Sequence, residues 1–198
     1  LHLLSRRQRQ MCIRDSFNKE VLQWREQRPD IIYIFSKDIL RHRRAQKEDA
    51  VWLKKGEEYK DETLSVRAFG STDVGVSFLL QAGGKKIFHA GDLNNWHWMD
   101  ESTEAEWKGA EKNFLHELDD LYAYTPEVDV AMFPVDPRLG KEYMRGAGQF
   151  VTKIKTHIFV PMHFTPEYAK ANAFRDFAEA HGVRFVSLTH RGQKIEIE

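Results

Sequence analysis

The sequence of 198 residues is 41% hydrophobic and 12% aromatic, a composition typical of a globular domain and not of a disordered chain. Lys plus Arg and Asp plus Glu each number 30, so the formal net charge is zero, which argues against nucleic acid or an anionic membrane as a partner. A single cysteine, Cys12, excludes an internal disulfide framework and a multi-thiolate zinc site.

Residues 1–15, LHLLSRRQRQMCIRD, are rich in arginine and carry no helical apolar pattern. They contain no apolar core of a secretory signal, and no later run approaches the roughly 20 apolar residues of a membrane span, so we expect a cytoplasmic protein. Two interpretations of this segment stay open. It is a disordered basic arm, or it is non-native, because QMCIRDS resembles translated adapter sequence from short-read assemblies. We favour the second, with the native chain truncated near Ser16.

From Phe17 onward, helical and strand-like apolar patterns follow one another. Phe17, Val21 and Trp24 recur at helical spacing before Pro29, and a turn is expected around Gly56 in the charged stretch 37–60. The predicted strands are 31–36, 63–69, 74–81, 85–90, 128–134, 157–162, 183–188 and 193–198, with a tight hairpin at Gly83-Gly84. Further helices are predicted over 103–122, 139–154 and 166–182. Residues 16–198 therefore read as one mixed α/β layered domain.

The segment IFHAGDLNNW places an acidic residue at the end of a strand. Gly91 allows the backbone to turn, and Asp92 then lies where rigid backbone can hold a ligand in position. An Asp that caps a turn is the alternative, and for an isolated Gly-Asp pair it is the more common one. Asp92 is a candidate metal ligand on this basis.

The segment HIFVPMHF delivers His163 at the end of another predicted strand. Open α/β sheets place their ligands at this edge, and neutral imidazole is the most common protein ligand for zinc and related metals. A hydrogen-bonded core histidine is the alternative. Two strands that each end in a ligand-type residue favour a site assembled from several strand ends, so Asp92 and His163 are the candidate catalytic residues.

These segments resemble the metallo-β-lactamase superfamily, whose members form an αββα sandwich with a one- or two-metal site at one edge. Asp92 matches the family's bridging Asp and His163 matches its late ligand His; VGVSFLLQAGGKKIFHAGD and VDVAMFPVDPRLG extend the match. The branch that includes ascorbate-6-phosphate lactonase is the most similar. The resemblance implies this α/β sandwich without its N-terminal strands, and a divalent cofactor, Zn²⁺ or alternatively Mn²⁺ or Mg²⁺.

Two departures from the family pattern affect the metal site. The family's first ligand cluster, His-x-His-x-Asp-His, is absent, and residues 15–18 stand where its end is expected. The segment GSTDVG (70–75) occupies the place of a Gly-His-Thr segment and has no His. Asp73 is a candidate oxygen ligand there, which would favour Mn²⁺ or Mg²⁺. The alternative, which stays equally open, is that Ser71, Thr72 and Asp73 only form a hydrogen-bonded turn between strands.

Several neighbouring residues have weaker signals. His89 is expected to support the ligands, and Trp96, His97 and Trp98 either line a substrate pocket or pack among aromatic rings. Arg138, next to Asp136, either holds an anionic group or forms a loop salt bridge.

The function implied by the resemblance is metal-dependent hydrolysis of an ester, lactone, amide or phosphodiester in a small-molecule substrate, in which metal-activated water attacks. This chain itself is expected to be an inactive fragment, because it lacks most of the ligands. The alternatives are a non-catalytic binding protein with the same fold, or a nucleic-acid-processing member, which the neutral charge disfavours. The substrate, the metal and the oligomeric state stay open.

Overall fold

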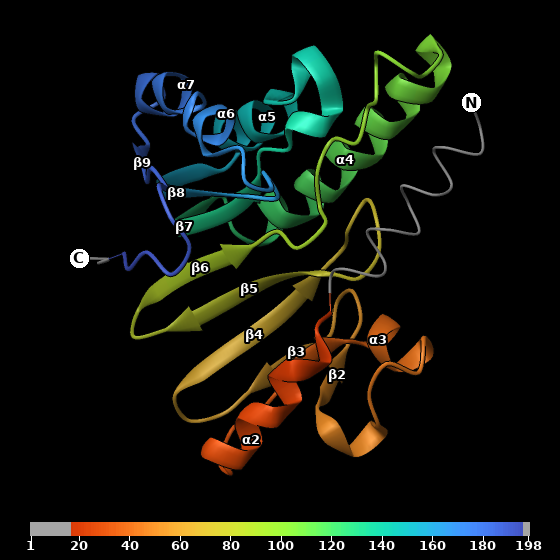
Figure 1. The fold of residues 1–198 in the computed structure, drawn as a ribbon, viewed down its shortest axis with the longest axis vertical. Coiled ribbons are helices and arrows are strands. Elements are labelled where there is room, and N and C mark those ends of the chain that lie inside the picture. Colours follow the sequence, from red (N-terminus) through yellow and green to blue (C-terminus); the bar gives the residue numbers. More distant parts are fainter. Residues whose placement is uncertain (1–16, 196–198) are drawn as a thin grey trace.

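The computed structural model describes residues 17–195 of the chain, so the predictions for residues 1–15 lie outside the described part. Its main element is a seven-stranded sheet in the order β3-β4-β5-β6-β7-β8-β9 (Figure 1). These strands are β3 (Glu58–Lys60), β4 (Leu64–Phe69), β5 (Ser77–Ala82), β6 (Lys85–His89), β7 (Glu127–Pro134), β8 (Lys155–Met162) and β9 (Arg184–Phe185). A mixed α/β fold is therefore confirmed.

The sheet changes direction at β6. From β3 to β6 each strand pairs antiparallel with the next, whereas β6, β7, β8 and β9 run parallel. The predicted hairpin between β5 and β6 is confirmed, because Gly83 and Gly84 both have positive φ, as a tight two-residue turn requires. The parallel strands need crossover helices, and these bring the ends of β6, β7 and β8 to one edge.

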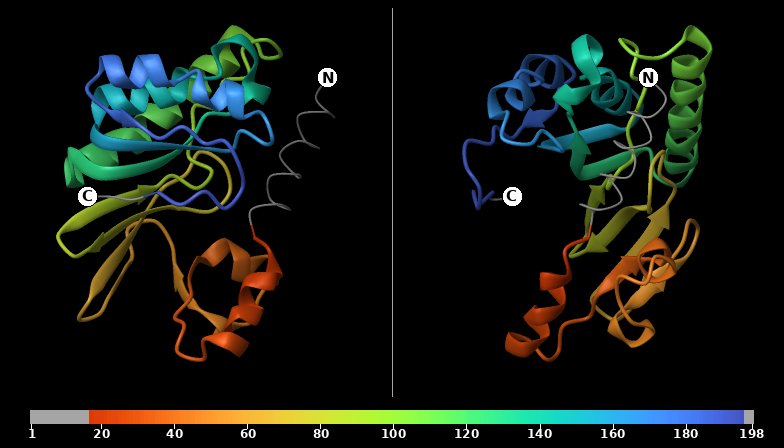
Figure 2. Two further views of the ribbon diagram at one scale, coloured as in Figure 1. Left: turned by 60° about the vertical axis from the view of Figure 1, so that its left-hand side comes forward. Right: turned by 45° about the vertical axis from the view of Figure 1, so that its right-hand side comes forward.

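The crossover helices cover one face of the parallel strands (Figures 1 and 2). They are α4 (Glu104–Tyr124), α5 (Arg145–Lys153), α6 (Tyr168–Asn172) and α7 (Arg175–Ala180). The predicted helix over 103–122 is confirmed as α4, which begins with a capping box between Thr103 and Glu106. Within the described residues, no helix is both long and apolar enough to cross a membrane.

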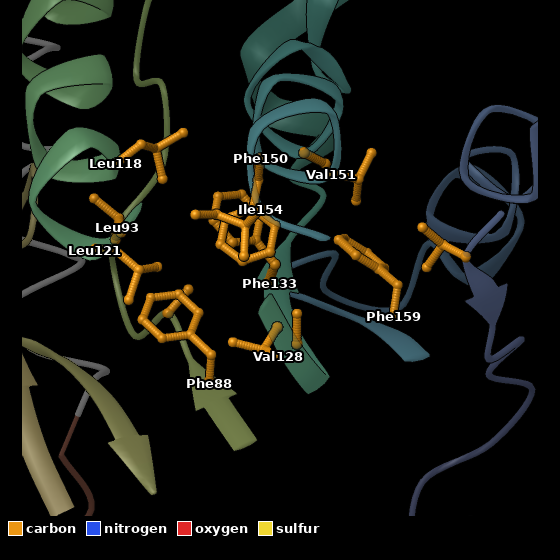
Figure 3. Close-up of a cluster of buried hydrophobic side chains, with 14 of the residues drawn as sticks. Phe88, Leu93, Leu118, Leu121, Val128, Phe133, Phe150, Val151, Ile154 and Phe159 are labelled. Carbon is orange, nitrogen blue, oxygen red and sulfur yellow. The ribbon is translucent and has the colours of Figure 1, made fainter. Parts of the chain in front are cut away.

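The main core lies between these helices and the sheet (Figure 3). Phe114, Leu118 and Leu121 of α4 and Phe150 of α5 are fully buried there against Phe133 of β7. On the opposite face of the sheet, Val130, Ile158 and Val160 form a smaller buried cluster, packed against partly buried residues that include Val186, Leu188 and Ile195. Both faces of the parallel strands are therefore covered, which accounts for their continuous apolar runs.

Residues 17–53 form a separate group of short elements beside β4 and β5 (Figure 2). They are η1 (Lys19–Gln23), α2 (Trp24–Gln27), β1 (Ile34–Ser36), α3 (Lys37–Arg41), η2 (Lys47–Asp49) and β2 (Val51–Leu53). β1 and β2 form a parallel two-stranded sheet. Leu53 packs with Val66, Ala68 and Val76, so this group is held against the antiparallel part of the main sheet.

Several predicted boundaries were wrong. The helix before Pro29 is divided into η1 and α2, and the charged stretch 37–60 contains α3, β2 and β3. The helix over 139–154 is interrupted because Gly140 has a φ of 80°, and the helix over 166–182 is divided into α6 and α7. The strand over 183–188 is only the two residues of β9, and residues 193–195 form no strand.

Candidate functional site

Asp92 follows β6 through a turn that only glycine accommodates easily. Gly91 has a φ of 57°, and a Cβ built on it would lie 2.8 Å from the carbonyl oxygen of Val76. L-residues with a Cβ are disfavoured at this φ, and the contact leaves no room for a methyl group. The turn directs Asp92 into a nearly closed position, with 5% of the residue exposed.

His163 follows β8 and meets Asp92 at the same edge of the sheet. Nε2 of His163 lies 3.0 Å from Oδ1 of Asp92. His163 has a φ of 60°, which is uncommon for a residue other than glycine and costs on the order of 1 kcal/mol. The structure thus brings together the two residues singled out in the sequence, in a strained backbone that often accompanies a functional position.

A second carboxylate, Asp136, lies on the other side of the His163 ring. Asp136 follows β7, is fully buried, and its Oδ2 lies 3.8 Å from Nδ1 of His163. Arg138 donates from Nε to both carboxylate oxygens of Asp136, at 2.9 and 3.0 Å, and Nη2 donates to Oδ2 as well. The loop salt bridge that the sequence left as an alternative for Arg138 is therefore present. The contact between Asp136 and His163 was not predicted from the sequence.

The charges in this group determine the protonation of His163. Partial burial disfavours the imidazolium, but the two carboxylates, Asp136 and Asp92, outweigh this effect and raise the pKa of His163 to about 9. Burial also raises the pKa of Asp136, but the hydrogen bonds from Arg138 outweigh it and the net pKa of Asp136 is lowered. Negative and positive side chains therefore alternate in the order Asp92, His163, Asp136 and Arg138.

Trp96 holds both candidate ligands from the loop after β6. Its Nε1 donates to the backbone oxygen of Asp92 at 2.8 Å, and its ring meets the ring of His163 edge-on at 5.9 Å. Trp98 stacks on Trp96 at 6.3 Å. His97 instead points inward and accepts from Met99 N at 3.1 Å. The WHW run thus packs behind the site, and none of its residues is among those that line the cavity beside it.

The segment 70–75 forms a turn, and the ligand role of Asp73 stays a prediction. Ser71 Oγ accepts from Asp73 N at 3.3 Å, and Thr72 Oγ1 donates to the backbone oxygen of Asn94. These bonds tie the turn to the loop that carries Asp92. The local hydrogen bonds match the turn alternative for Ser71 to Asp73.

The donor set does not fit a complete metal centre. Across residues 17–195, no group of three or more His, Cys, Asp or Glu is arranged to hold a metal ion. A zinc site takes three or four protein ligands, whereas the two candidates, Asp92 and His163, would provide two, and His163 has a carboxylate near each ring nitrogen. The two candidate ligands alone would therefore not complete a metal site.

A cavity of about 610 Å³ opens beside Asp92 and His163. His89 and Arg138 also line it, and residues between Phe17 and Arg44 supply a further part of its wall. Nδ1 of His89 accepts from Gly91 N at 3.1 Å, so His89, an exposed residue, supports the turn that carries Asp92. Its role in supporting the candidate ligands stays a prediction. The volume lies within the roughly 300–1,000 Å³ typical of small-molecule sites.

No protein-family model matches the sequence, and the search of curated proteins gives no significant match. Solved structures do match. A metallo hydrolase, Igni18, from Ignicoccus hospitalis aligns with a TM-score of 0.55 at 15% identity, over 85% of this chain and 70% of that one. A structure from Parabacteroides distasonis, assigned as a metal-dependent hydrolase, aligns with a TM-score of 0.53 at 15% identity, over 79% and 64%.

A third structure, from Thermotoga maritima, is assigned as a Zn-dependent hydrolase of the metallo-β-lactamase superfamily; it aligns with a TM-score of 0.40 at 19% identity, over 66% of this chain and 59% of that one. The chain thus spans between 59% and 70% of the length of these three structures. The predicted fold class is confirmed by the first two of these alignments, which show that the chain shares its fold with solved metal-dependent hydrolases.

Proposed function

We propose that this chain is part of a metal-dependent hydrolase in which Asp92 and His163 are metal ligands. The observation that carries the proposal is their convergence: two residues at the ends of β6 and β8 approach to 3.0 Å, beside a cavity of about 610 Å³. A pocket with a few convergent polar and titratable side chains is the usual first candidate for an active site. The solved metal-dependent hydrolases with the same fold support this assignment.

The proposed reaction is the addition of water across an ester, lactone, amide or phosphodiester bond of a small molecule. The hydroxyl of water goes to the acyl carbon or phosphorus, and its remaining proton goes to the leaving oxygen or nitrogen. A divalent ion held by Asp92 and His163 together with further ligands would supply a water of lowered pKa and would polarise the bond that breaks. Zn²⁺ suits the imidazole of His163, and Mn²⁺ or Mg²⁺ would be favoured if Asp73 contributes an oxygen.

We also propose that the 198-residue chain binds metal weakly and is inactive, because two ligands cannot form a complete shell. The test titrates Zn²⁺ into the chain by calorimetry and measures hydrolysis of simple esters, lactones and phosphodiesters. We expect substoichiometric, weak binding that Asp92→Asn removes. His181→Gln is the control, since His181 is exposed, follows the last residue of α7 and does not line the cavity. Tight, stoichiometric zinc in the unmodified chain would contradict an incomplete site.

On the hypothesis from the sequence that residues 1–15 are not native, an extended chain is made in which the sequence found upstream in the gene replaces them. The same measurements on this extended chain test the hydrolase itself. We expect that chain to bind stoichiometric metal and to hydrolyse at least one of the substrate types, with both properties lost in His163→Gln.

One observation favours a second candidate, a non-catalytic binding protein. His163 is already flanked by Asp92 and Asp136, and Arg138 pairs with Asp136, so the polar groups satisfy one another without a metal. If the extended chain binds no metal, this candidate replaces the hydrolase.

A further inference from the structure

The wall of the cavity formed by residues 17–44 is built around aromatic rings. Phe35 contacts Phe17 at 5.2 Å between ring centroids, Tyr33 at 5.3 Å and Trp52 at 5.9 Å. Phe17 and Phe35 both line the cavity, while Tyr33 and Trp52 support them from behind. Such ring contacts stabilise the wall beyond the burial of their area.

The wall is also apolar on the sheet side. Val76 and Phe78, at the start of β5, line the cavity and pack in the same cluster as Ile34 of β1. Ile39, on the short helix α3, closes the wall above them with a partly exposed side chain. Apolar walls with a few polar groups at one end are typical of sites for small organic molecules.

The charged residues that line the cavity are balanced and already engaged. Arg44, Arg138 and the imidazolium of His163 line the cavity, and so do Asp38 and Asp92. The third negative charge is Asp136, which contacts both Arg138 and His163. Arg44 donates from Nη2 to the backbone oxygen of Phe17 at 2.7 Å, and Arg138 pairs with Asp136. Ser36 Oγ donates to Asp38 at 2.9 Å. A ligand with a net charge in its main body therefore gains little from this wall.

We propose that the cavity selects an uncharged acyl compound, an ester, lactone or amide whose acyl group is a medium-length aliphatic chain or an aryl ring. The apolar group contacts Phe17, Phe35 and Ile39, and the carbonyl end lies at Asp92 and His163. The identity of the reacting bond rests on the proposed function, whereas the binding of the apolar group depends on the cavity alone.

Binding of amides that are not cleaved tests this without any requirement for catalysis. N-methyloctanamide, N-methylacetamide and octyl phosphate are titrated by calorimetry into the full 198-residue chain in the presence of a chelator. We expect N-methyloctanamide to bind at least about tenfold more tightly than N-methylacetamide, a small part of what burial of its longer chain can supply. We expect octyl phosphate to bind no more tightly than N-methyloctanamide.

Two variants of the same residue type locate the binding. Ile39→Asp places a carboxylate in the wall and is expected to weaken N-methyloctanamide by at least about tenfold. Ile32→Asp is the matched control, because Ile32 is 57% exposed and does not line the cavity. The affinity of this variant for N-methyloctanamide is expected to stay within about twofold of that of the unmodified chain. Ile39→Ala, with an expected loss of about threefold, serves if the aspartate variant does not fold by circular dichroism.

Equal affinity for the long and short amides, or equal loss in Ile39→Asp and Ile32→Asp, overturns the proposal. Preferred binding of octyl phosphate overturns it in favour of an anion site. The two proposals can also fail separately. If the long amide binds selectively but the extended chain shows neither bound metal nor activity, the proposal for the cavity is supported and the proposal of a hydrolase is contradicted.

Discussion

The two ends of the main sheet differ in how much core supports them. Toward β9, β7 and β8 have eight residues each and α4 has 21, and their side chains form one large buried cluster. Toward β3, the group 17–53 is made of strands of three residues and helices of at most five. The large core fixes the strand ends that carry Asp92 and His163, whereas the small group shapes the cavity beside them. Stability and ligand selection therefore depend on different parts of the chain.

The largest expected effect compares a phenylalanine from each region. Phe133 is fully buried in the main core, so Phe133→Ala should lower the free energy of unfolding by about 3–5 kcal/mol. Phe35 is only partly buried, and Phe35→Ala should cost about 1–2 kcal/mol. Urea denaturation followed by circular dichroism measures both. Equal losses would mean that the group 17–53 is as firmly packed as the main core.

This difference in core also explains which parts of the fold the sequence could predict. The pattern Phe114, Leu118, Leu121 defines α4, because a long helix repeats its apolar face often enough to be recognised. The three-residue strands β2 and β3 are too short to show a repeating apolar pattern. Their position is determined by tertiary contacts with β4. Gly140 shows that a glycine in a helical pattern can mark a break, which the apolar pattern alone did not reveal.

The approach of the two candidate ligands could be predicted from the sequence, whereas the residues that support them could not. Asp92 and His163 stand at strand ends in recognisable motifs, and their approach follows from the parallel order of β6, β7 and β8. The contact of Asp136 with His163 depends on the exact course of the loop after β7. The bond from Trp96 to Asp92 depends on one side-chain rotamer. Neither leaves a periodic signal, although a tryptophan four residues after a candidate ligand is a pattern to examine.

A smaller effect is expected at Gly91, which lies against Val76 of the buried cluster that also contains Leu53. Gly91→Ala must hold a φ of 57° and bring a methyl group to 2.8 Å from Val76 O, so we expect a loss of about 2–3 kcal/mol. Gly83→Ala is the control, because Gly83 has a φ of 56° with no atom within 4 Å of the added Cβ. Its loss should be about 1 kcal/mol. Thermal unfolding of both variants separates the contact from the backbone strain, and identical melting temperatures would remove the contact as a cause.

Trp96→Phe should have an effect of about 1 kcal/mol, because it keeps an aromatic ring beside His163 but removes the donor to Asp92 O. The ¹⁵N resonances of the His163 imidazole should also shift. Trp24→Phe in the other region is the control: Trp24 is 56% exposed, and its replacement should change stability by less than about 0.5 kcal/mol. An unchanged His163 spectrum in Trp96→Phe would show that Trp96 does not position the site.

The smallest effect on stability is expected for two glutamates whose pKa values are both lowered. Glu111 lies in the main core region, and Glu57 lies beside α3. Hydrogen bonds from Arg145 and Gln149 outweigh burial in lowering the pKa of Glu111. Because the folded pKa is depressed, the stabilisation is fully present above the ordinary value of 4.5 and is lost as pH falls through the lower folded value. Glu111→Gln keeps an acceptor oxygen, so its loss at neutral pH should be below that of Trp96→Phe.

The pH dependence distinguishes the two regions. Between about pH 6 and about pH 3, Glu111→Gln should lose less stability than the unmodified chain, because one group that titrates in the folded state is gone. The pKa of Glu57 is lowered chiefly by a hydrogen bond from Lys37, a pair that is partly open to solvent on both sides. Solvent screening weakens this contribution, so Glu57→Gln should change the acid branch less than Glu111→Gln does. Melting temperatures across this range measure both variants. If Glu57→Gln flattened the acid branch as much as Glu111→Gln, the ion pair between Lys37 and Glu57 would hold the group 17–53 in place as strongly as Arg145 and Glu111 stabilise the main core region.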